Sequence, residues 1–320
     1  MSFKAKKFQN KVAESRMALP ATCIYALCMS VIGCELSNQL AIHIGLLAIT
    51  SVLMMELNNA NALIRIYSRM VSCSFLVLAV MSQFLFADLK CGIAQACYVA
   101  FFLFFFSAYQ SPSAVGRIFY AFVMLGIASM LFPQLVFFVP LIWLLLCTNI
   151  MVGSIRMLVA SLLGLTMPYW FWAAYLAYTD IHRLNIIPEH FVSLFSFCPL
   201  SAWHDVPMGQ VLTTAFVVLV SLMGIINFRL NNYKDKIRTR MLFEIFTIMS
   251  LCTILFIVLQ PTLLHHLLGL LIVCTAPMAG HYIALTHSRM SNISFVLMLL
   301  FAFTITIINK WMLFLSLIHI

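Results

Sequence analysis

Long, uninterrupted apolar segments recur along the whole chain, and they constrain its fold more than any other feature. Each is about 17–25 residues long, the length of an α-helix that crosses the hydrocarbon core of a bilayer. In lipid, every backbone N–H and C=O group must be paired within the protein, so only helices and closed barrels can cross. Barrel strands alternate apolar and polar residues, whereas these segments are continuously apolar. The sequence therefore predicts an all-α transmembrane helix bundle that forms one integral-membrane domain, residues 1–320.

The composition excludes a soluble fold. Of the 320 residues, 64% are hydrophobic and only 8% are charged, whereas roughly a quarter of a soluble domain is charged. The net charge of +9 does not indicate nucleic-acid binding, because the basic residues lie between apolar segments and form no patch on a soluble domain. No Cys-x-x-Cys pair occurs among the ten cysteines, and we expect no cofactor. The expected partners are membrane lipids, a lipid-linked substrate and other membrane subunits.

We predict eleven membrane spans. They cover residues 17–34, 39–56, 70–87, 91–109, 117–132, 134–149, 155–178, 209–228, 241–259, 263–284 and 292–308. The fifth and sixth form one apolar stretch, which we divide at Pro133 because proline removes a backbone donor and breaks helices. The alternative is a single kinked helix, although about 33 residues exceed one ordinary span. Val31–Cys34 also fits a lipoprotein cleavage site, but ten further spans already anchor the chain.

The distribution of basic residues predicts the orientation, because cytoplasmic loops carry an excess of lysine and arginine. With the N-terminus in the cytoplasm, fifteen of the eighteen Lys and Arg residues lie on the inner side. The exceptions are Lys90, Arg183 and Lys310. A single helix through Pro133 would move the basic cluster at 229–240 to the outer side. The charges therefore favour eleven spans in a bacterial inner (plasma) membrane, with the N-terminus inside and the C-terminus outside.

One sizeable segment, residues 179–208, is expected on the outer side, and we call it the outer segment. Its charged residues and histidines are interspersed with apolar and aromatic residues. Such a mixture is typical of a segment that lies in the headgroup region with its apolar side in lipid. The alternative is a re-entrant or interfacial loop whose charges are merely solvated.

The candidate site residues lie in and beside the outer segment. Histidine titrates near neutral pH and acts as a general base, and arginine binds phosphate through two parallel hydrogen bonds. A lipid-linked pyrophosphate substrate needs these groups. We therefore predict Arg183 as the phosphate ligand, His182, His190 or His204 as the base, and Glu35 or Asp180 as a supporting acid. The histidine spacing matches no metal-ligand motif, so no metal site is predicted.

Other ionisable residues lie within spans, where they are costly and therefore candidates for function. His43 and His281 would serve a transporter, although a histidine bonded to a backbone carbonyl is the plainer explanation. The pair at 265–266 begins the tenth span. Glu244 follows Arg240 by four residues, a spacing that predicts an ion pair on one helix face.

Three stretches resemble a known family: ELNNANALIRIYSRM (56–70), RIFYAFVMLGIASMLFPQLVFFVPLIWLLL (117–146) and ASLLGLTMPYWFW (160–172). They are similar to an uncharacterised family of polytopic inner-membrane proteins from gliding-type bacteria and their gut relatives. The resemblance implies a bacterial inner membrane and lends no catalytic residue. The layout also resembles GT-C-type glycosyltransferases and O-antigen ligases, which act on polyprenyl-linked sugars, and it would give Glu35 the place of their acid after the first span.

Three functions follow from these patterns. The first is cell-envelope biogenesis, in which the protein handles a lipid-linked glycan at the outer face. The second is a non-catalytic scaffold or a subunit of a membrane complex, which fits the scarcity of polar residues within the spans. The third is a transporter of a small or lipidic solute, in which His43 and His281 would line a polar cavity near the middle of the bilayer.

Overall fold

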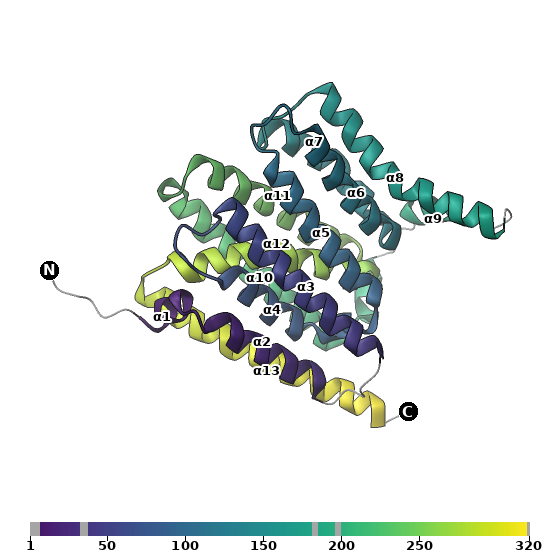
Figure 1. Ribbon diagram of the computed structural model, residues 1–320. Coiled ribbons are helices and arrows are strands. Elements are labelled where there is room, and N and C mark those ends of the chain that lie inside the picture. The colour runs from purple at the N-terminus through teal and green to yellow at the C-terminus, as the bar shows by residue number, and fades with distance from the viewer. Residues whose placement is uncertain (1–6, 33–37, 181–184, 196–199, 319–320) are drawn as a thin grey trace.

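The computed structural model describes residues 7–32, 38–180, 185–195 and 200–318, and within these ranges it contains helices and no strands (Figure 1). The α-helices are α1 (Phe8–Glu14), α2 (Ala18–Val31), α3 (Asn38–Asn61), α4 (Met70–Met81), α5 (Leu89–Ser107), α6 (Val115–Leu131), α7 (Val139–Thr148), α8 (Ile155–Thr179), α9 (Ile186–Val192), α10 (Met208–Asn231), α11 (Ile237–Leu259), α12 (Leu264–Leu285) and α13 (Arg289–Ile318). Short 3₁₀ helices are η1 (Gln83–Ala87), η2 (Pro133–Phe138), η4 (Ser193–Phe195), η5 (Leu200–Asp205), η6 (Asn232–Lys234) and η7 (Pro261–Leu263).

Seven helices of the described chain are long and apolar enough to cross a membrane. They are α3, α5, α8, α10, α11, α12 and α13, and α2, α4, α6 and α7 are shorter apolar helices. Each of these eleven helices coincides with one apolar segment of the sequence. The prediction of a multi-pass, all-helical membrane protein is confirmed, while the eleven crossings and their orientation stay predictions.

The chain reverses at Pro133, between α6 and α7. At this end of the bundle the ring of Phe132 stacks on the ring of His266, with 4.9 Å between centroids. After α7 the chain has returned to the other end, where the carbonyl of Ile150 accepts a hydrogen bond from the amide of Gln110. Since Gln110 precedes α6, the two helices run in opposite directions, and the alternative of one kinked helix is wrong.

The core of the bundle is α12, which is buried along almost its whole length between α4, α5, α10 and α11. Small residues on α12 and on its neighbours allow this close packing. A Cβ added at Gly280 would lie 2.9 Å from the amide nitrogen of Val71 on α4. A Cβ added at Gly224 of α10 would lie 2.9 Å from the Cβ of Met278.

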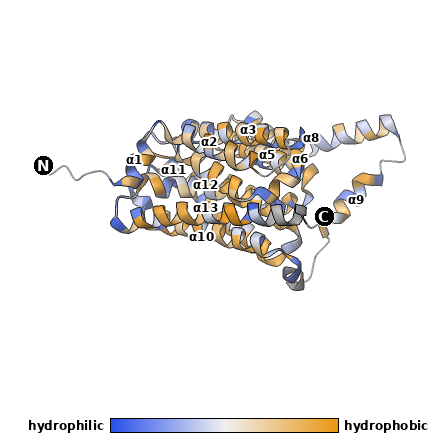
Figure 2. Cartoon of the chain, turned by 90° about the horizontal axis from the view of Figure 1, so that it is seen from below, coloured by the Kyte–Doolittle hydropathy of each residue, from blue (hydrophilic) through white to orange (hydrophobic). Residues whose placement is uncertain are grey.

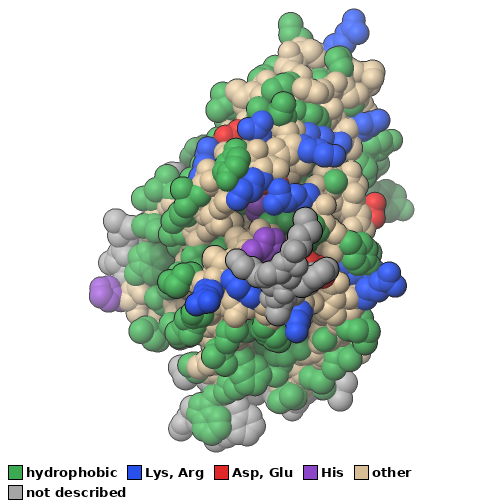
Figure 3. Space-filling view, turned by 90° about the vertical axis from the view of Figure 1, so that its left-hand side faces the viewer, with side chains coloured by type: hydrophobic (Ala, Val, Ile, Leu, Met, Phe, Trp, Pro, Cys, Tyr) green, Lys and Arg blue, Asp and Glu red, His purple; other side chains and the backbone are tan. Residues whose placement is uncertain are grey.

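One end of the bundle is strongly basic, and we call it the basic end. It consists of α1, residues 15–17, the connections 62–69, 108–114, 149–154, 232–236 and 286–288, and the helix turns that adjoin them. Figure 3 views this end and shows lysine and arginine side chains spread across it. Among the described residues, only Lys90 and Lys310 of the lysines and arginines lie elsewhere. By the positive-inside rule the basic end is the predicted cytoplasmic side.

The opposite end, which we call the distal end, carries η1, η2, η7 and the described part of the outer segment. The last turns of α8 extend beyond the rest of the bundle there, and the chain returns toward the bundle through α9 (Figure 2). Figure 2 also shows hydrophobic residues along most of the helices, with hydrophilic residues concentrated near α1. This distribution agrees with a bundle whose flanks face lipid.

Candidate functional site

The outer segment lies across the distal end and is tied to several helices. The side-chain amide of Gln134 in η2 donates to the carbonyl of Ser193, at 3.3 Å. Further along, the indole N–H of Trp203 donates to the carbonyl of Val258, near the end of α11. Polar groups thus fix an otherwise apolar segment in place over the bundle, as a segment at a membrane–water boundary requires.

Of the described candidate residues, His190 has the most elaborate surroundings. Its Nε2 lies 3.3 Å from the carbonyl oxygen of Ser129 on α6. The edge of its ring contacts Trp172 of α8, at 5.4 Å between centroids. The hydroxyl of Tyr169 is 2.9 Å from the hydroxyl of Ser129. Burial between these side chains lowers the pKa of His190, and the hydrogen bond to Ser129 opposes that shift in part.

The other predicted site residues are placed differently. Asp180 follows the last turn of α8 and is exposed. His204 is exposed in η5, which packs on η7 near the end of α11. Asp180, His190 and His204 are therefore at three separate positions along the outer segment. His182, Arg183 and Glu35 lie outside the described residues.

An apolar groove of about 510 Å³ runs between α6 and α8 on the flank of the bundle. It is lined by Val123, Ile127, Met130, Met167, Pro168, Phe171, Trp172 and Tyr175. Trp172 both lines this α6–α8 groove and contacts His190. Trp172 therefore lies between the groove and the polar cluster of His190, Tyr169 and Ser129.

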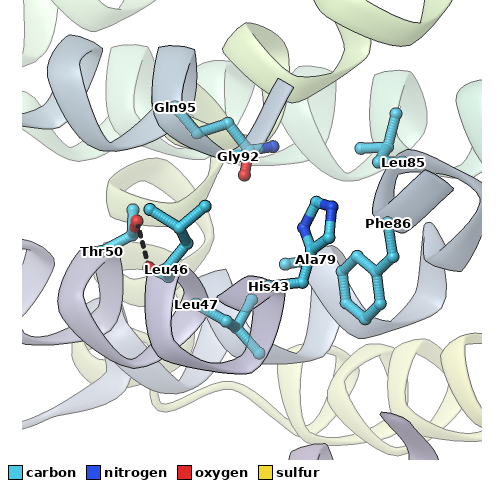
Figure 4. A pocket seen from close by; sticks show the side chains of 9 residues that line it. All are labelled: His43, Leu46, Leu47, Thr50, Ala79, Leu85, Phe86, Gly92 and Gln95. Carbon is cyan, nitrogen blue, oxygen red and sulfur yellow. Dashed lines mark hydrogen bonds between the residues drawn. The ribbon is translucent and has the colours of Figure 1, made fainter. Parts of the chain in front are cut away.

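The span histidines do not share a cavity. His43 of α3 lines a cavity of only about 10 Å³, which has room for one water molecule. Figure 4 shows its ring in the space between Gly92 and Phe86, and it stacks on Phe86 with 5.6 Å between centroids. The Nε2 atom of His43 is buried and has no hydrogen-bond partner in the described part of the protein.

His281 lies at the basic end, whereas His43 lies near the distal end. The Nε2 atom of His281 is 2.9 Å from a carboxylate oxygen of Asp235, in the connection between α10 and α11. Arg65 approaches the second carboxylate oxygen at 3.9 Å, and the rings of Phe228 and Phe243 contact the imidazole. The polar cavity shared by His43 and His281, which a transporter would need, is not found among the described residues.

A further histidine pair opens α12 at the distal end. His266 Nε2 lies 3.4 Å from the carboxylate of Asp88, and His265 Nε2 lies 3.1 Å from the side-chain oxygen of Gln210. Asp88 also caps α5, because its side chain accepts a hydrogen bond from the amide of Lys90. These bonds join α5, α10 and α12, so the two histidines have a structural role in connecting these helices.

Two features of these sites were not predicted from the sequence. The first is Asp235, which is the only acid in the basic stretch 229–240. A single acidic residue among basic residues is only a weak indication that it pairs with a buried residue. The second is the Ser129–Tyr169 pair on α6 and α8. It has no signal in the sequence, because apolar periodicity does not indicate which helices are neighbours.

These observations define the class: a multi-pass helical membrane protein with an apolar groove on its flank and a polar cluster beside it. Comparison with protein-family models, with curated proteins and with solved structures finds no match for this chain. The resemblance to polytopic inner-membrane proteins therefore stays a prediction, as does the similarity of layout to glycosyltransferases and ligases.

Proposed function

We propose that the protein handles a lipid-linked anionic glycan at the outer face of a bacterial inner membrane, as a step in cell-envelope biogenesis. The observation that supports the proposal is the α6–α8 groove, whose lining residue Trp172 contacts His190. A polyprenyl tail is apolar and matches the lining of the groove, while a phosphate headgroup needs polar partners at the membrane–water boundary.

The state of His190 fits a role as general base. A carbonyl oxygen can only accept a hydrogen bond, so Nε2 of His190 carries the proton that it donates to Ser129. In the neutral ring Nδ1 then has a lone pair and can accept a proton. Burial lowers the pKa of His190 and thereby keeps the ring neutral at physiological pH. The ring is then able to take a proton from an attacking hydroxyl group.

The remaining candidates complete the proposed site. Arg183 binds the phosphate through two parallel hydrogen bonds, and Asp180 or Glu35 orients the base. The sequence also offers His182 and His204 as the general base. We place His190 first because its ring contacts Trp172, a residue of the groove lining. The substrate class follows from this combination of an apolar groove, a phosphate ligand and a base.

The test is a deletion strain whose lipid-linked glycans are profiled by mass spectrometry. We expect a precursor to accumulate, and we expect wild-type protein and the His204→Ala variant to restore the profile. The His190→Ala and Arg183→Ala variants should fail to do so, although they reach the membrane in normal amounts. Precursors and products that are unchanged in the deletion strain would contradict the proposal.

A second function, a non-catalytic subunit of a membrane complex, is favoured by a different observation. The second half of α8 carries large exposed aromatic residues, and the last turns of this helix extend beyond the bundle (Figure 1). They are Trp170, Phe171, Tyr175 and Tyr178. Aromatic residues are enriched both at membrane interfaces and in protein–protein contacts. Crosslinking from position 178 in native membranes distinguishes the two, because a subunit gives a defined protein adduct.

A further inference from the structure

A second apolar cavity, distinct from the α6–α8 groove, lies at the basic end. It has a volume of about 290 Å³ and lies between α2, α4, α10, α12 and α13, with α1 across its end. The hydroxyl of Tyr25 on α2 bonds to the hydroxyl of Thr306 on α13. Phe8 and Val12 of α1 line the end of the cavity nearest the aqueous side.

The cavity runs along the helices for the length of an acyl-chain segment. On α4 it is lined from Met70, the first residue of the helix, to Leu78. These residues are about 12 Å apart along the helix axis. The lining is almost wholly apolar, and a site of this kind does not hold a water cluster, because each water needs two or more polar partners. An apolar chain is therefore the occupant that matches the space.

One polar group in the cavity lacks a partner. Ser74 lines the cavity and is 8% exposed, and its hydroxyl makes no hydrogen bond within the described residues. It lies one helical turn, about 6 Å, deeper than Met70. The hydroxyl oxygen is itself buried and does not open onto the cavity, so the surface that the cavity presents to an occupant is apolar.

Basic residues lie next in sequence to the lining residues at the aqueous end. Lys7 and Lys11 adjoin the lining residues of α1, and Arg69 directly precedes Met70. Arg289 begins α13, the helix that forms one wall. Glu14 is the one acid on α1, so the charge around the entrance is positive. A positive entrance above an apolar cavity is complementary to an anionic headgroup with a hydrocarbon tail.

We propose that this cavity binds one acyl chain of an anionic glycerophospholipid from the leaflet at the basic end. The phosphate lies beside Lys7, Lys11 and Arg69, and the chain fills the space between α2, α4 and α13. A helix of a second copy or of a partner is too wide for the cavity, since a helix is about 10–12 Å across. The site is at the opposite end from the proposed glycan site and does not depend on it.

The test measures the lipid retained by the full-length protein, using native mass spectrometry after purification with phosphatidylglycerol or phosphatidylcholine. Wild-type protein should retain one phosphatidylglycerol per chain and release phosphatidylcholine. Val77→Phe fills the cavity and should abolish retention. Val52→Phe is the matched control, because Val52 is 57% exposed on the lipid-facing side of α3, and it should retain the lipid as wild type does.

A further variant leaves the apolar lining unchanged, so it decides the matter even if Val77→Phe does not fold. Lys7→Gln with Lys11→Gln removes two charges and should weaken binding by on the order of tenfold. Full retention by folded Val77→Phe, unchanged affinity in the double lysine variant, or equal retention of phosphatidylcholine by wild type would each overturn the proposal.

Discussion

His281 and Asp235 form a buried pair at the basic end, with 2.9 Å between Nε2 and the carboxylate and side chains that are 3% and 4% exposed. The pair joins the centre of the bundle, α12, to the connection between α10 and α11. Arg65 adds the connection after α3, since it donates to the carbonyl of Lys234 at 3.1 Å. Three segments that are far apart in sequence are thus held together by one carboxylate and its neighbours.

Removing one partner of this pair should be costly. Asp235→Ala leaves His281 buried without its acceptor, and breaking a buried pair in this way typically costs about 3–5 kcal/mol. We expect a clearly lower midpoint of thermal unfolding and faster proteolysis in the connection at 232–236. Asp205→Ala, at an exposed aspartate, is the control and should leave the unfolding midpoint and the proteolysis rate unchanged.

The double variant Asp235→Leu/His281→Leu should recover part of the lost stability, because no charge is then buried alone. A loss of stability equal to the sum of the losses in the two single variants would contradict this explanation.

The packing of α6 against α8 makes a second prediction. A Cβ at Gly164 of α8 would lie 2.4 Å from the carbonyl oxygen of Phe119 on α6, so Gly164→Ala must separate the helices. Such overpacking typically costs about 1–3 kcal/mol. Gly45→Ala is the matched control, since its Cβ would meet nothing within 4 Å and alanine favours a helix by up to about 1 kcal/mol. Thermal unfolding should therefore shift in opposite directions for the two variants. Equal shifts would show that the helix contact is not what matters.

The sequence predicted the helices well, because span length and apolar continuity are local properties. Pro133 was identified as a reversal for a local reason too, the loss of a backbone donor. Partners across the bundle were not predicted correctly. Glu244 was expected to pair with Arg240 on its own helix, and this is wrong: its carboxylate is 3.2 Å from Arg229 of α10, and Asn149 also donates to it. Helical spacing allows a local pair worth only a few tenths of a kcal/mol, so a better-placed partner on another helix prevails.

The candidate site was predictable only in outline. Clustered histidines and aromatic residues indicated the outer segment, and its position across the distal end agrees with an interfacial location. The groove could not be foreseen, because it depends on the pairing of α6 with α8 at Gly126 and Gly164. Likewise, Ser129 became a partner of His190 only through that pairing. Composition indicates what chemistry is available, while helix neighbours decide which side chains meet.

The orientation predicts which surfaces an impermeant reagent reaches. Tyr233 in the connection after α10 is 70% exposed, and Tyr178 near the end of α8 is 91% exposed. With the basic end in the cytoplasm, a membrane-impermeant maleimide added to intact cells whose outer membrane has been permeabilised should label Tyr178→Cys and spare Tyr233→Cys. Inverted membrane vesicles should reverse the result. The wild-type protein gives the background from its native cysteines, and labelling of both variants from the same side would contradict the predicted topology.

The final prediction concerns the docking of α9, and its sign follows from the pKa of His190. Burial lowers that pKa in the folded protein, with the hydrogen bond to Ser129 as an opposing effect. α9 has seven residues and lies outside the spans, so its detachment is a local event. When it detaches, His190 regains the ordinary histidine pKa of about 6.5.

Between the lowered pKa and about 6.5, the detached state binds more protons than the docked state, so the stability of docking rises with pH. The contribution is fully present above about pH 6.5 and is lost as the pH falls through the lowered pKa of the docked state. Hydrogen exchange of the α9 amides, corrected for the intrinsic exchange rate at each pH, should therefore show weaker protection at pH 5 than at pH 7. In His190→Gln, which cannot titrate, protection should no longer depend on pH in this range. A pH dependence that persists in this variant would show that another group controls the docking of α9.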